Sequence, residues 1–295
     1  MNASNAYALS PPSPNTSLTI VGASSTLGKL IIPDIPKLLP HYKSITLVTG
    51  PTNKSFPDLK KLLPSATLQT YTEFESSSAR CPNTDCLFIT PPSSFASYSS
   101  TLTSLLPKFP PPSTITLISS AGVYGNLSGP VTSLTPLSST PTPRQSNLQS
   151  GESAILSHPN GYIIRLAGLW TSTRGPHRYW VENGSVKGDP SGGVNLLHYS
   201  DAATAVIKCL SNLRTYDGEE RVVLVSDGQG TVSRKNICEV TVKSRKWKGK
   251  RVMPEFVGGE TKRGRPEKEP ERVYIPSGEL LEGWEGGRSF EDGMS

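Results

Sequence analysis

The sequence contains few cysteines, and they form no recognisable metal or disulfide pattern. None of the four belongs to a Cys-x-x-Cys pair or has a histidine nearby at the spacing of a zinc site; they are Cys81, Cys86, Cys209 and Cys238. We therefore expect reduced thiols in a reducing compartment and no metal site.

Long apolar runs are also missing. No run reaches the roughly 20 residues of a membrane-spanning helix, so we expect no membrane partner. Residues 1–16 have neither a basic start nor an apolar stretch, unlike a secretory signal. Their composition, rich in Ser and Asn and without acids, predicts a disordered N-terminal tail on a cytoplasmic protein. A plastid or other organelle is the alternative location.

Hydrophobic residues are scarce, at 35%, whereas 27 Pro and 26 Gly indicate long loops. The net charge of +6 is concentrated in residues 241–273, which hold eleven Lys/Arg and five Glu. A basic protein often binds nucleic acid. This stretch is interrupted by Gly and Pro and has few aromatics, so we interpret residues 243–268 as a solvated basic loop. A polyanion-binding patch is the alternative.

Short apolar runs alternate with helical patterns along the chain. We expect strands at 18–21, 44–48, 67–69, 86–89, 114–118, 162–165, 194–197 and 221–225. We expect helices at 30–39, 56–63, 95–106, 145–157, 201–213 (capped by Ser200) and 233–242. A Ser/Thr/Pro-rich loop should cover 127–143. This alternation predicts an α/β fold with a parallel sheet covered on both faces.

A glycine-containing turn follows the first expected strand. It has the form Gly-x-x-x-x-x-Gly between Gly22 and Gly28, with Ser25 where a middle glycine often occurs. Such a turn lets the backbone approach a diphosphate at the start of a helix. An ordinary strand-to-helix turn is the alternative. The candidate cofactor-binding residues here are Gly22, Ser24, Ser25, Thr26, Leu27 and Gly28.

The second expected strand ends without the carboxylate that would bind the ribose of NAD. The sequence offers Thr49 and Lys54 instead. Hydroxyls and a cation suit the 2′-phosphate of NADP, so NADP is slightly favoured over NAD. A plain loop with a surface lysine remains open. Thr90 and Pro91, after the fourth strand, are further candidates for cofactor binding.

The segment Ser119-Ser-Ala-Gly-Val-Tyr-Gly125 closes the fifth expected strand. It resembles the Ser-Ser-x-x-Val-Tyr-Gly signature of the extended and atypical short-chain dehydrogenases/reductases, the NAD-dependent epimerase/dehydratase group. The resemblance implies that Ser120 hydrogen-bonds a reacting hydroxyl or carbonyl, and that Ser119 lies at the cofactor.

Further stretches resemble the same family, from about residue 17 to residue 293, and are closest to the atypical YeeZ-like subgroup. They are 165–170 with 174–176, 195–201, and 272–293. The resemblance implies a Rossmann-type doubly wound parallel sheet with a small C-terminal α/β subdomain on the substrate side. We expect an NAD(P)-binding domain over 17–165, a substrate-side region over 166–295, and cofactor contacts from Leu166, Ala167 and Gly168.

The family's catalytic Tyr, and the Lys four residues after it, are absent. No Tyr or Lys occurs between Gly125 and Pro159, and by spacing the two positions fall near Arg144 or Gln145 and near Leu148 or Gln149. Tyr124 is a candidate catalytic phenol, with a packed aromatic as the alternative. Arg144, Arg174 and His198 are candidate substrate-binding residues, with surface or structural roles as alternatives.

Two functions from different classes follow. The first is an NAD(P)-dependent oxidoreductase or epimerase that acts on a carbonyl or sugar-like small molecule without the usual relay. The second is a non-catalytic dinucleotide-binding sensor or scaffold. We do not expect nucleic acid as a partner, and the sequence does not indicate an oligomeric state or a substrate.

Overall fold

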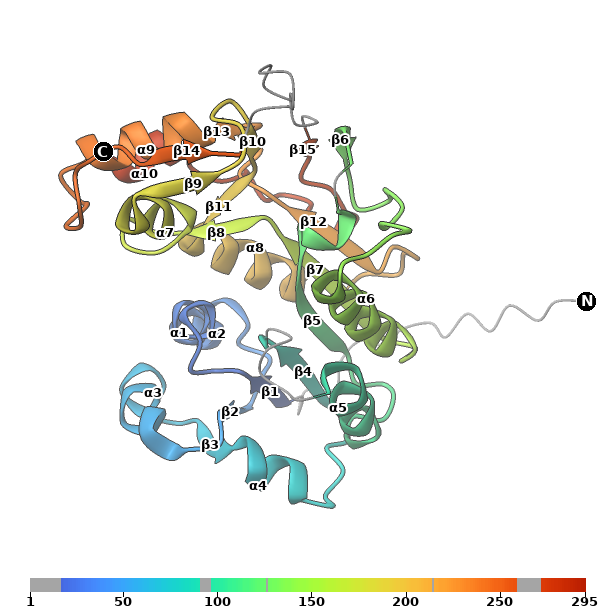
Figure 1. The fold of residues 1–295 in the computed structure, drawn as a ribbon. Coiled ribbons are helices and arrows are strands. Elements are labelled where there is room, and N and C mark those ends of the chain that lie inside the picture. Colours follow the sequence, from blue (N-terminus) through green and yellow to red (C-terminus); the bar gives the residue numbers. More distant parts are fainter. Residues whose placement is uncertain (1–16, 91–96, 126, 214, 259–271) are drawn as a thin grey trace, which may run out of the picture.

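A parallel sheet organises the chain in the computed structural model, which describes residues 17–90, 97–125, 127–213, 215–258 and 272–295 (Figure 1). Its seven strands lie in the order β12-β7-β5-β4-β1-β2-β3, and all neighbours are parallel. The strands are β1 (Ser17–Val21), β2 (Ser44–Thr49), β3 (Thr67–Thr70), β4 (Thr84–Phe88), β5 (Ile115–Ser120), β7 (Gly161–Leu166) and β12 (Val222–Val225). The expected Rossmann-type doubly wound sheet is confirmed.

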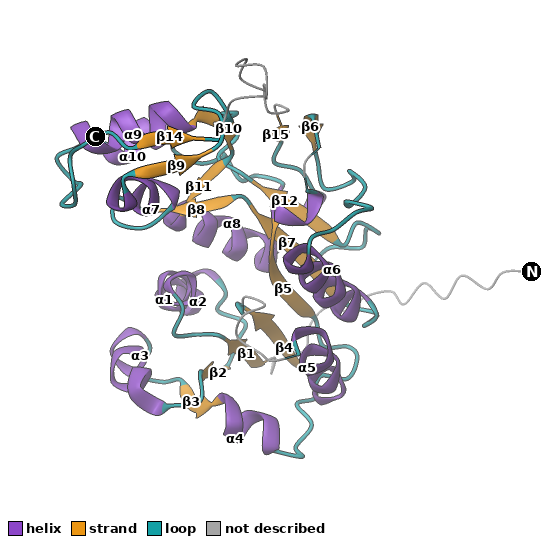
Figure 2. Cartoon of the chain, in the orientation of Figure 1, coloured by secondary structure: helices purple, strands orange, loops and turns teal. Residues whose placement is uncertain are grey.

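Helices cover both faces of the sheet, as Figure 2 shows. On one face α1 (Thr26–Ile31) packs against α8 (Tyr199–Asn212), and on the other α5 (Tyr98–Leu105) packs against α6 (Pro143–Leu156). Alternate strand residues enter different cores because successive side chains point to opposite faces. Two separate apolar clusters result, one on the α1 and α8 side and one on the α5 and α6 side. The other helices of the N-terminal half are α2 (Ile35–Leu38), α3 (Phe56–Leu62) and α4 (Tyr71–Ser76).

Several local expectations differ from the structure. The helix expected at 30–39 is divided into the end of α1, a 3₁₀ turn at Ile32–Asp34 and α2. The strand expected at 194–197 is split into β10 (Gly193–Val194) and β11 (Leu196–His198). His198, and not Ser200, caps α8, because its ring nitrogen accepts a hydrogen bond from the Ser200 amide. The loop expected at 127–143 contains β6 (Gly129–Val131), which pairs with β15 (Arg272–Tyr274).

The C-terminal region adds a third apolar core above the sheet in Figure 1. Parallel pairs join β8 (Gly168–Trp170) to β11 and β9 (Ser185–Lys187) to β14 (Glu255–Val257), and β10 pairs antiparallel with β13 (Val232–Ser233). The helices of this region are α7 (Pro176–Asn183), α9 (Arg234–Lys243) and α10 (Phe290–Met294). Since β12 and α8 also come from beyond residue 165, the C-terminal half completes the large sheet.

In the described part of the basic stretch the lysines and arginines are exposed, and residues 244–254 form no helix or strand. One tryptophan anchors this segment. Trp247 is 3% exposed, and its indole nitrogen donates to the Lys250 carbonyl oxygen at 2.7 Å. The Lys250 ammonium in turn donates to the Glu182 carbonyl oxygen at 2.9 Å. Residues 259–268, and the tail expected at 1–16, lie outside the described residues.

The described chain has no disulfide bond and no helix suited to a membrane. All four cysteines are free thiols, and three of them are buried. Among the helices that the structure describes, none combines the length and apolarity needed to cross a membrane.

His177 provides a test of the C-terminal core. It is fully buried, with ring centroids 5.7 Å from Trp247 and 5.5 Å from Phe290. Burial lowers its pKa to about 4, against smaller opposing effects of the Ser172 backbone and Glu182. An unfolded histidine titrates near a pKa of about 6.5, so between these values the unfolded chain binds more protons. The free energy of unfolding should therefore fall as the pH is lowered from 6.5 to 4, by on the order of 3 kcal/mol.

The measurement is the urea midpoint between pH 7 and pH 4 for the wild type and for His177→Leu. Asp227 acts in the opposite sense, since burial raises its pKa to about 6 and its protonation on acidification favours the folded state. The difference between the two proteins isolates His177, because Asp227 is common to both. Parallel pH profiles would show that this histidine is not held neutral.

Candidate functional site

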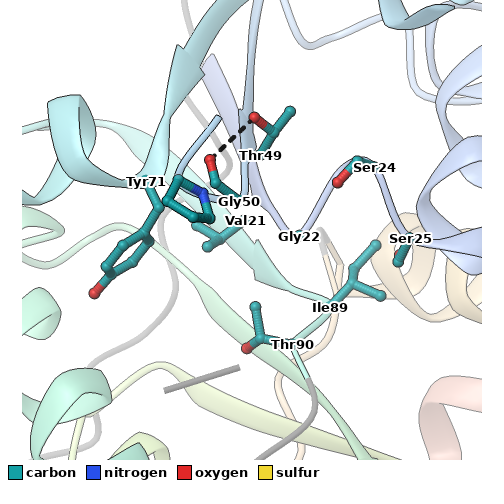
Figure 3. A pocket seen from close by; sticks show the side chains of 10 residues that line it. Val21, Gly22, Ser24, Ser25, Thr49, Gly50, Tyr71, Ile89 and Thr90 are labelled. Carbon is teal, nitrogen blue, oxygen red and sulfur yellow. Dashed lines mark hydrogen bonds between the residues drawn. The ribbon is translucent and has the colours of Figure 1, made fainter. Parts of the chain in front are cut away.

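A cavity of about 240 Å³ lies at the carboxyl ends of β1, β2 and β4 (Figure 3). The chain leaves β1 toward β2 on one side and later returns to β4 on the other, so the strand order reverses here. Open α/β sheets bind ligands at such switch points. The lining residues are Val21, Gly22, Ser24, Ser25, Thr49, Gly50, Pro51, Tyr71, Ile89 and Thr90.

Gly22 shapes the floor of this cavity. Its φ is +87°, and a Cβ atom there would lie 2.3 Å from the Ile89 carbonyl oxygen. Gly28 is similarly constrained, since its Cβ would lie 2.5 Å from the carbonyl oxygen of Ala23. The two glycines thus let β1, β4 and α1 approach one another closely.

The residues between these glycines face different surroundings. The Ser25 hydroxyl accepts a hydrogen bond from the Gly28 amide at 3.0 Å and so caps α1. The Thr26 hydroxyl oxygen is 2.7 Å from Nη1 of Arg174, which donates to it. Leu27 is 3% exposed and packs in the core, so its side chain is directed away from a ligand. Ser24 and Ser25 both line the cavity.

The remaining polar lining comes from two threonines. The Thr49 hydroxyl donates to the Gly50 carbonyl oxygen, which Figure 3 marks with a dashed line. The Thr90 hydroxyl is buried and has no hydrogen-bond partner among the described residues. A buried hydroxyl without a partner carries a desolvation cost that a polar ligand atom would relieve. Lys54 is exposed and lies outside the lining, and Pro91 lies outside the described residues.

Tyr71 is a wall of the cavity that the sequence reasoning missed. It opens α4, directly after β3, and its hydroxyl donates to Glu75 at 3.2 Å. Burial is the largest of the causes that raise its pKa, with Glu75 contributing in the same direction. The available signal was the capping box at Thr70 and Glu73, in which each side chain accepts from the other residue's amide. Thr70 is both the last residue of β3 and the N-cap of α4, so Tyr71, the first residue of α4, lies at the end of that strand.

The two serines that end β5 point in opposite directions. The Ser119 hydroxyl is buried and donates to Glu152 Oε1 at 2.6 Å. The Ser120 hydroxyl accepts from the Gly122 amide at 3.1 Å and is half-buried. Alternation along a strand explains the difference, and it leaves Ser120 as the serine whose side chain reaches the end of the sheet.

Tyr124 lies inside the protein. Its side chain is fully buried, and its hydroxyl donates to the Thr132 carbonyl oxygen at 2.9 Å and accepts from Arg165 at 2.8 Å. Arg165 forms a buried ion pair with Glu152, with Nη2 2.7 Å from Oε2. Burial raises the pKa of Tyr124, while Arg165 lowers it to a smaller extent. These contacts match the alternative role of a packed aromatic.

Two glutamines occupy the inward-facing positions where the family's relay was expected. The Gln145 amide donates to the Gly122 carbonyl oxygen at 3.0 Å. Four residues later, the Gln149 amide donates to the carbonyl oxygens of Val123 and Ser138, at 3.4 and 3.2 Å. Carboxamides do not exchange protons near neutral pH, so these side chains fix the loop after β5 without replacing the relay.

The other predicted residues are spread around the sheet edge. Arg144 is exposed on α6, and His198 packs its ring 4.8 Å from that of Trp170. Leu166 and Ala167 are buried at the end of β7, and Gly168 begins β8. A second cavity, of about 440 Å³, lies beside the loop after β5. Its lining combines the apolar residues Leu127, Pro136 and Leu137 with polar residues, which include Thr135, Ser138, Ser139, Thr140, Thr142 and Gln145.

Known structures share this arrangement, although no family model and no curated protein matches the chain. A dTDP-glucose 4,6-dehydratase from Bacillus anthracis in complex with NAD matches with a TM-score of 0.66 and 15% identity, over 95% of this chain and 94% of that one. DesIV, a dTDP-glucose 4,6-dehydratase from Streptomyces venezuelae with NAD and TYD bound, matches with a TM-score of 0.68 and 13% identity, over 94% of each chain. A UDP-glucose 4-epimerase from Thermotoga maritima with UDP-glucose matches with a TM-score of 0.63 and 14% identity, over 95% of this chain and 96% of that one.

The chain has the fold of the extended short-chain dehydrogenases/reductases. The match includes the C-terminal region as well as the sheet, because it covers about 95% of the chain. In this short-chain dehydrogenase/reductase fold, the cavity of Figure 3 lies at the switch point after β1. The resemblance that the sequence indicated is therefore confirmed at the level of the fold.

Proposed function

We propose that this chain binds a nicotinamide dinucleotide in the cavity at the ends of β1, β2 and β4. The observation that carries the proposal is a cavity with a glycine floor at the point where the strand order of the sheet reverses. Gly22 leaves the floor open, and the Thr90 hydroxyl is buried without a partner among the described residues. The similar dTDP-glucose 4,6-dehydratases from Bacillus anthracis and Streptomyces venezuelae both hold NAD. Bound there, the cofactor supplies hydride transfer, while Ser24, Ser25 and Thr49 offer hydroxyls to its phosphates and ribose.

NADP is the form that we favour. No carboxylate belongs to the cavity lining among the described residues, so the ribose 2′-hydroxyl would lack there the acceptor that NAD sites commonly provide. Lys54 follows β2 on an exposed turn, where a flexible ammonium group can pair with a 2′-phosphate.

A non-catalytic sensor or scaffold is the role that the relay positions favour. Gln145 and Gln149 hold backbone carbonyl groups, and the Tyr124 hydroxyl is engaged by Arg165 and Thr132. An oxidoreductase or epimerase for a carbonyl or sugar-like substrate is the second candidate. It is favoured by the half-buried Ser120 hydroxyl at the end of β5 and by the cavity of mixed polar and apolar lining beside the loop that follows.

Fluorescence titration with NADPH and NADH tests the binding. We expect micromolar binding of NADPH, weaker binding of NADH, and a roughly five- to tenfold loss of NADPH affinity in Lys54→Glu, with NADH affected less. Lys61→Glu is the matched control, since Lys61 is an exposed lysine on α3 that does not line the cavity. Failure of both nucleotides to bind at high micromolar concentration would overturn the proposed function.

Turnover separates the two roles. The wild type and Ser120→Ala are incubated with NADPH and a panel of carbonyl compounds, and the absorbance of the reduced cofactor is followed. Turnover that is lost in Ser120→Ala supports the enzyme. Binding without any turnover supports the sensor or scaffold.

A further inference from the structure

Arg174 connects the C-terminal region to the glycine turn. It lies in the turn after β8, where its backbone exchanges hydrogen bonds with Thr171 at 2.7 and 3.3 Å. Its Nη1 atom donates to the Thr26 hydroxyl at 2.7 Å, across 148 positions of sequence. The guanidinium carbon is 5.7 Å from the centre of the Tyr199 ring. The arginine is exposed, and its guanidinium group nevertheless has a defined place beside the turn.

The described lining of the cavity contributes no charge. None of the ten described residues that line it is charged. A diphosphate carries about two negative charges, and transferring them from water is costly without a cation nearby. Lys29 on α1 lies 3.5 Å from the Asp58 carboxylate. Arg174 is the cation that the structure bonds directly to the turn.

We propose that Arg174 binds the diphosphate of the dinucleotide; the inference rests on the proposed function. A guanidinium group has five N–H donors in a planar fork that matches phosphate oxygens. One donor reaches Thr26, so others can meet a phosphate above the same turn. The Thr90 hydroxyl, buried without a described partner, independently marks the adjoining cavity as a site for polar ligand atoms. The sequence predicted Arg174 as a substrate-binding residue; its contact with Thr26 is the observation that supports a role at the cofactor.

The experiment compares ligands with and without a diphosphate. Calorimetry measures the affinities of NADPH, ADP-ribose and adenosine 2′-monophosphate for four proteins. They are the wild type, Arg174→Gln, Arg174→Lys and Arg178→Gln. Arg178→Gln removes the same charge from α7, where Arg178 pairs with Glu182 at 3.1 Å and is exposed. We expect Arg174→Gln to lower the affinity for NADPH and ADP-ribose by about 10- to 100-fold, and the affinity for the monophosphate by less than about threefold. Arg174→Lys should recover part of the loss, and Arg178→Gln should change neither affinity.

The outcomes separate the inference from the proposed function. If the wild type binds neither NADPH nor ADP-ribose, the proposed function fails, and the inference fails with it. If the wild type binds both and Arg174→Gln binds them equally well, the inference alone fails. An equal loss for the monophosphate would also overturn it, because the variant would then have altered the whole site. An unchanged thermal midpoint is expected for the exposed Arg174 and verifies that the variant is folded.

Discussion

Glu152→Ala is expected to lower the free energy of unfolding by about 3–5 kcal/mol, because it leaves a buried arginine without its partner. Glu152 and Arg165 have side chains only 2% and 5% exposed, and Nε and Nη2 of the guanidinium group both donate to the carboxylate. Without the carboxylate, the cation would remain between α6 and the sheet with Tyr124 as its polar contact. The hydrogen bond that the Ser119 hydroxyl donates to Glu152 would be lost as well.

Urea unfolding measures this loss, with the midpoint as the readout and an unchanged slope as evidence of comparable transitions. Glu182→Ala is the matched control, because it removes a glutamate from an exposed pair with Arg178 and should cost less than about 1 kcal/mol. The double variant Glu152→Leu/Arg165→Met removes both charges together and should recover most of the stability. Equal midpoints for Glu152→Ala and Glu182→Ala would contradict the assignment of a buried, tightly paired network.

The same network argues against Tyr124 as a substitute for the missing relay. A general acid must release its proton toward a substrate, whereas this phenol donates to the Thr132 carbonyl oxygen inside the protein. Arg165 also lies over the Tyr124 ring, 4.9 Å from its centre. These contacts connect the loop after β5 to β7. We therefore infer that Tyr124 and Arg165 shape the edge of the site and do not take part in proton transfer.

The sheet was predictable because its signal is local. Short apolar runs such as 44–48 and 162–165 are separated by helical patterns and by Gly and Pro, and this alternation determines parallel pairing. The glycine turn was predictable for the same reason, since Gly22 and Gly28 directly follow the first apolar run. The resemblance of the segment 119–125 to a known signature then indicated the fold of the whole chain.

The contacts that complete the site were not predictable from local patterns. Arg174 contacts Thr26 across 148 positions of sequence, and no spacing rule relates residues so far apart. Trp247 lies in a stretch whose charge density suggests solvation, yet its indole is buried against α7 and α10 residues. Ser119 and Ser120 look equivalent in sequence, and only the register of β5 decides which one faces Glu152.

Gly22→Ala is expected to reduce dinucleotide affinity by at least about 100-fold, because the new methyl group has no room. Its Cβ would lie 2.3 Å from the Ile89 carbonyl oxygen and 3.2 Å from Thr90 Cγ2, and the backbone φ of +87° is strained for an alanine. Relief requires β1 and β4 to separate at the end where the cavity opens. The variant should also lose about 1–3 kcal/mol of unfolding free energy from backbone strain alone.

Gly50→Ala is the control for this substitution, because Gly50 lines the same cavity. A Cβ atom at Gly50 would meet nothing within 4 Å, and its φ is outside the range that favours glycine. We expect Gly50→Ala to retain wild-type stability, because the added methyl group meets no atom within 4 Å, so the comparison isolates the strain and contacts at Gly22. Titration and urea unfolding of both variants test the pair. Wild-type affinity in a folded Gly22→Ala protein would show that the dinucleotide does not lie against this turn, since an added methyl group at its floor must displace either the ligand or the strand.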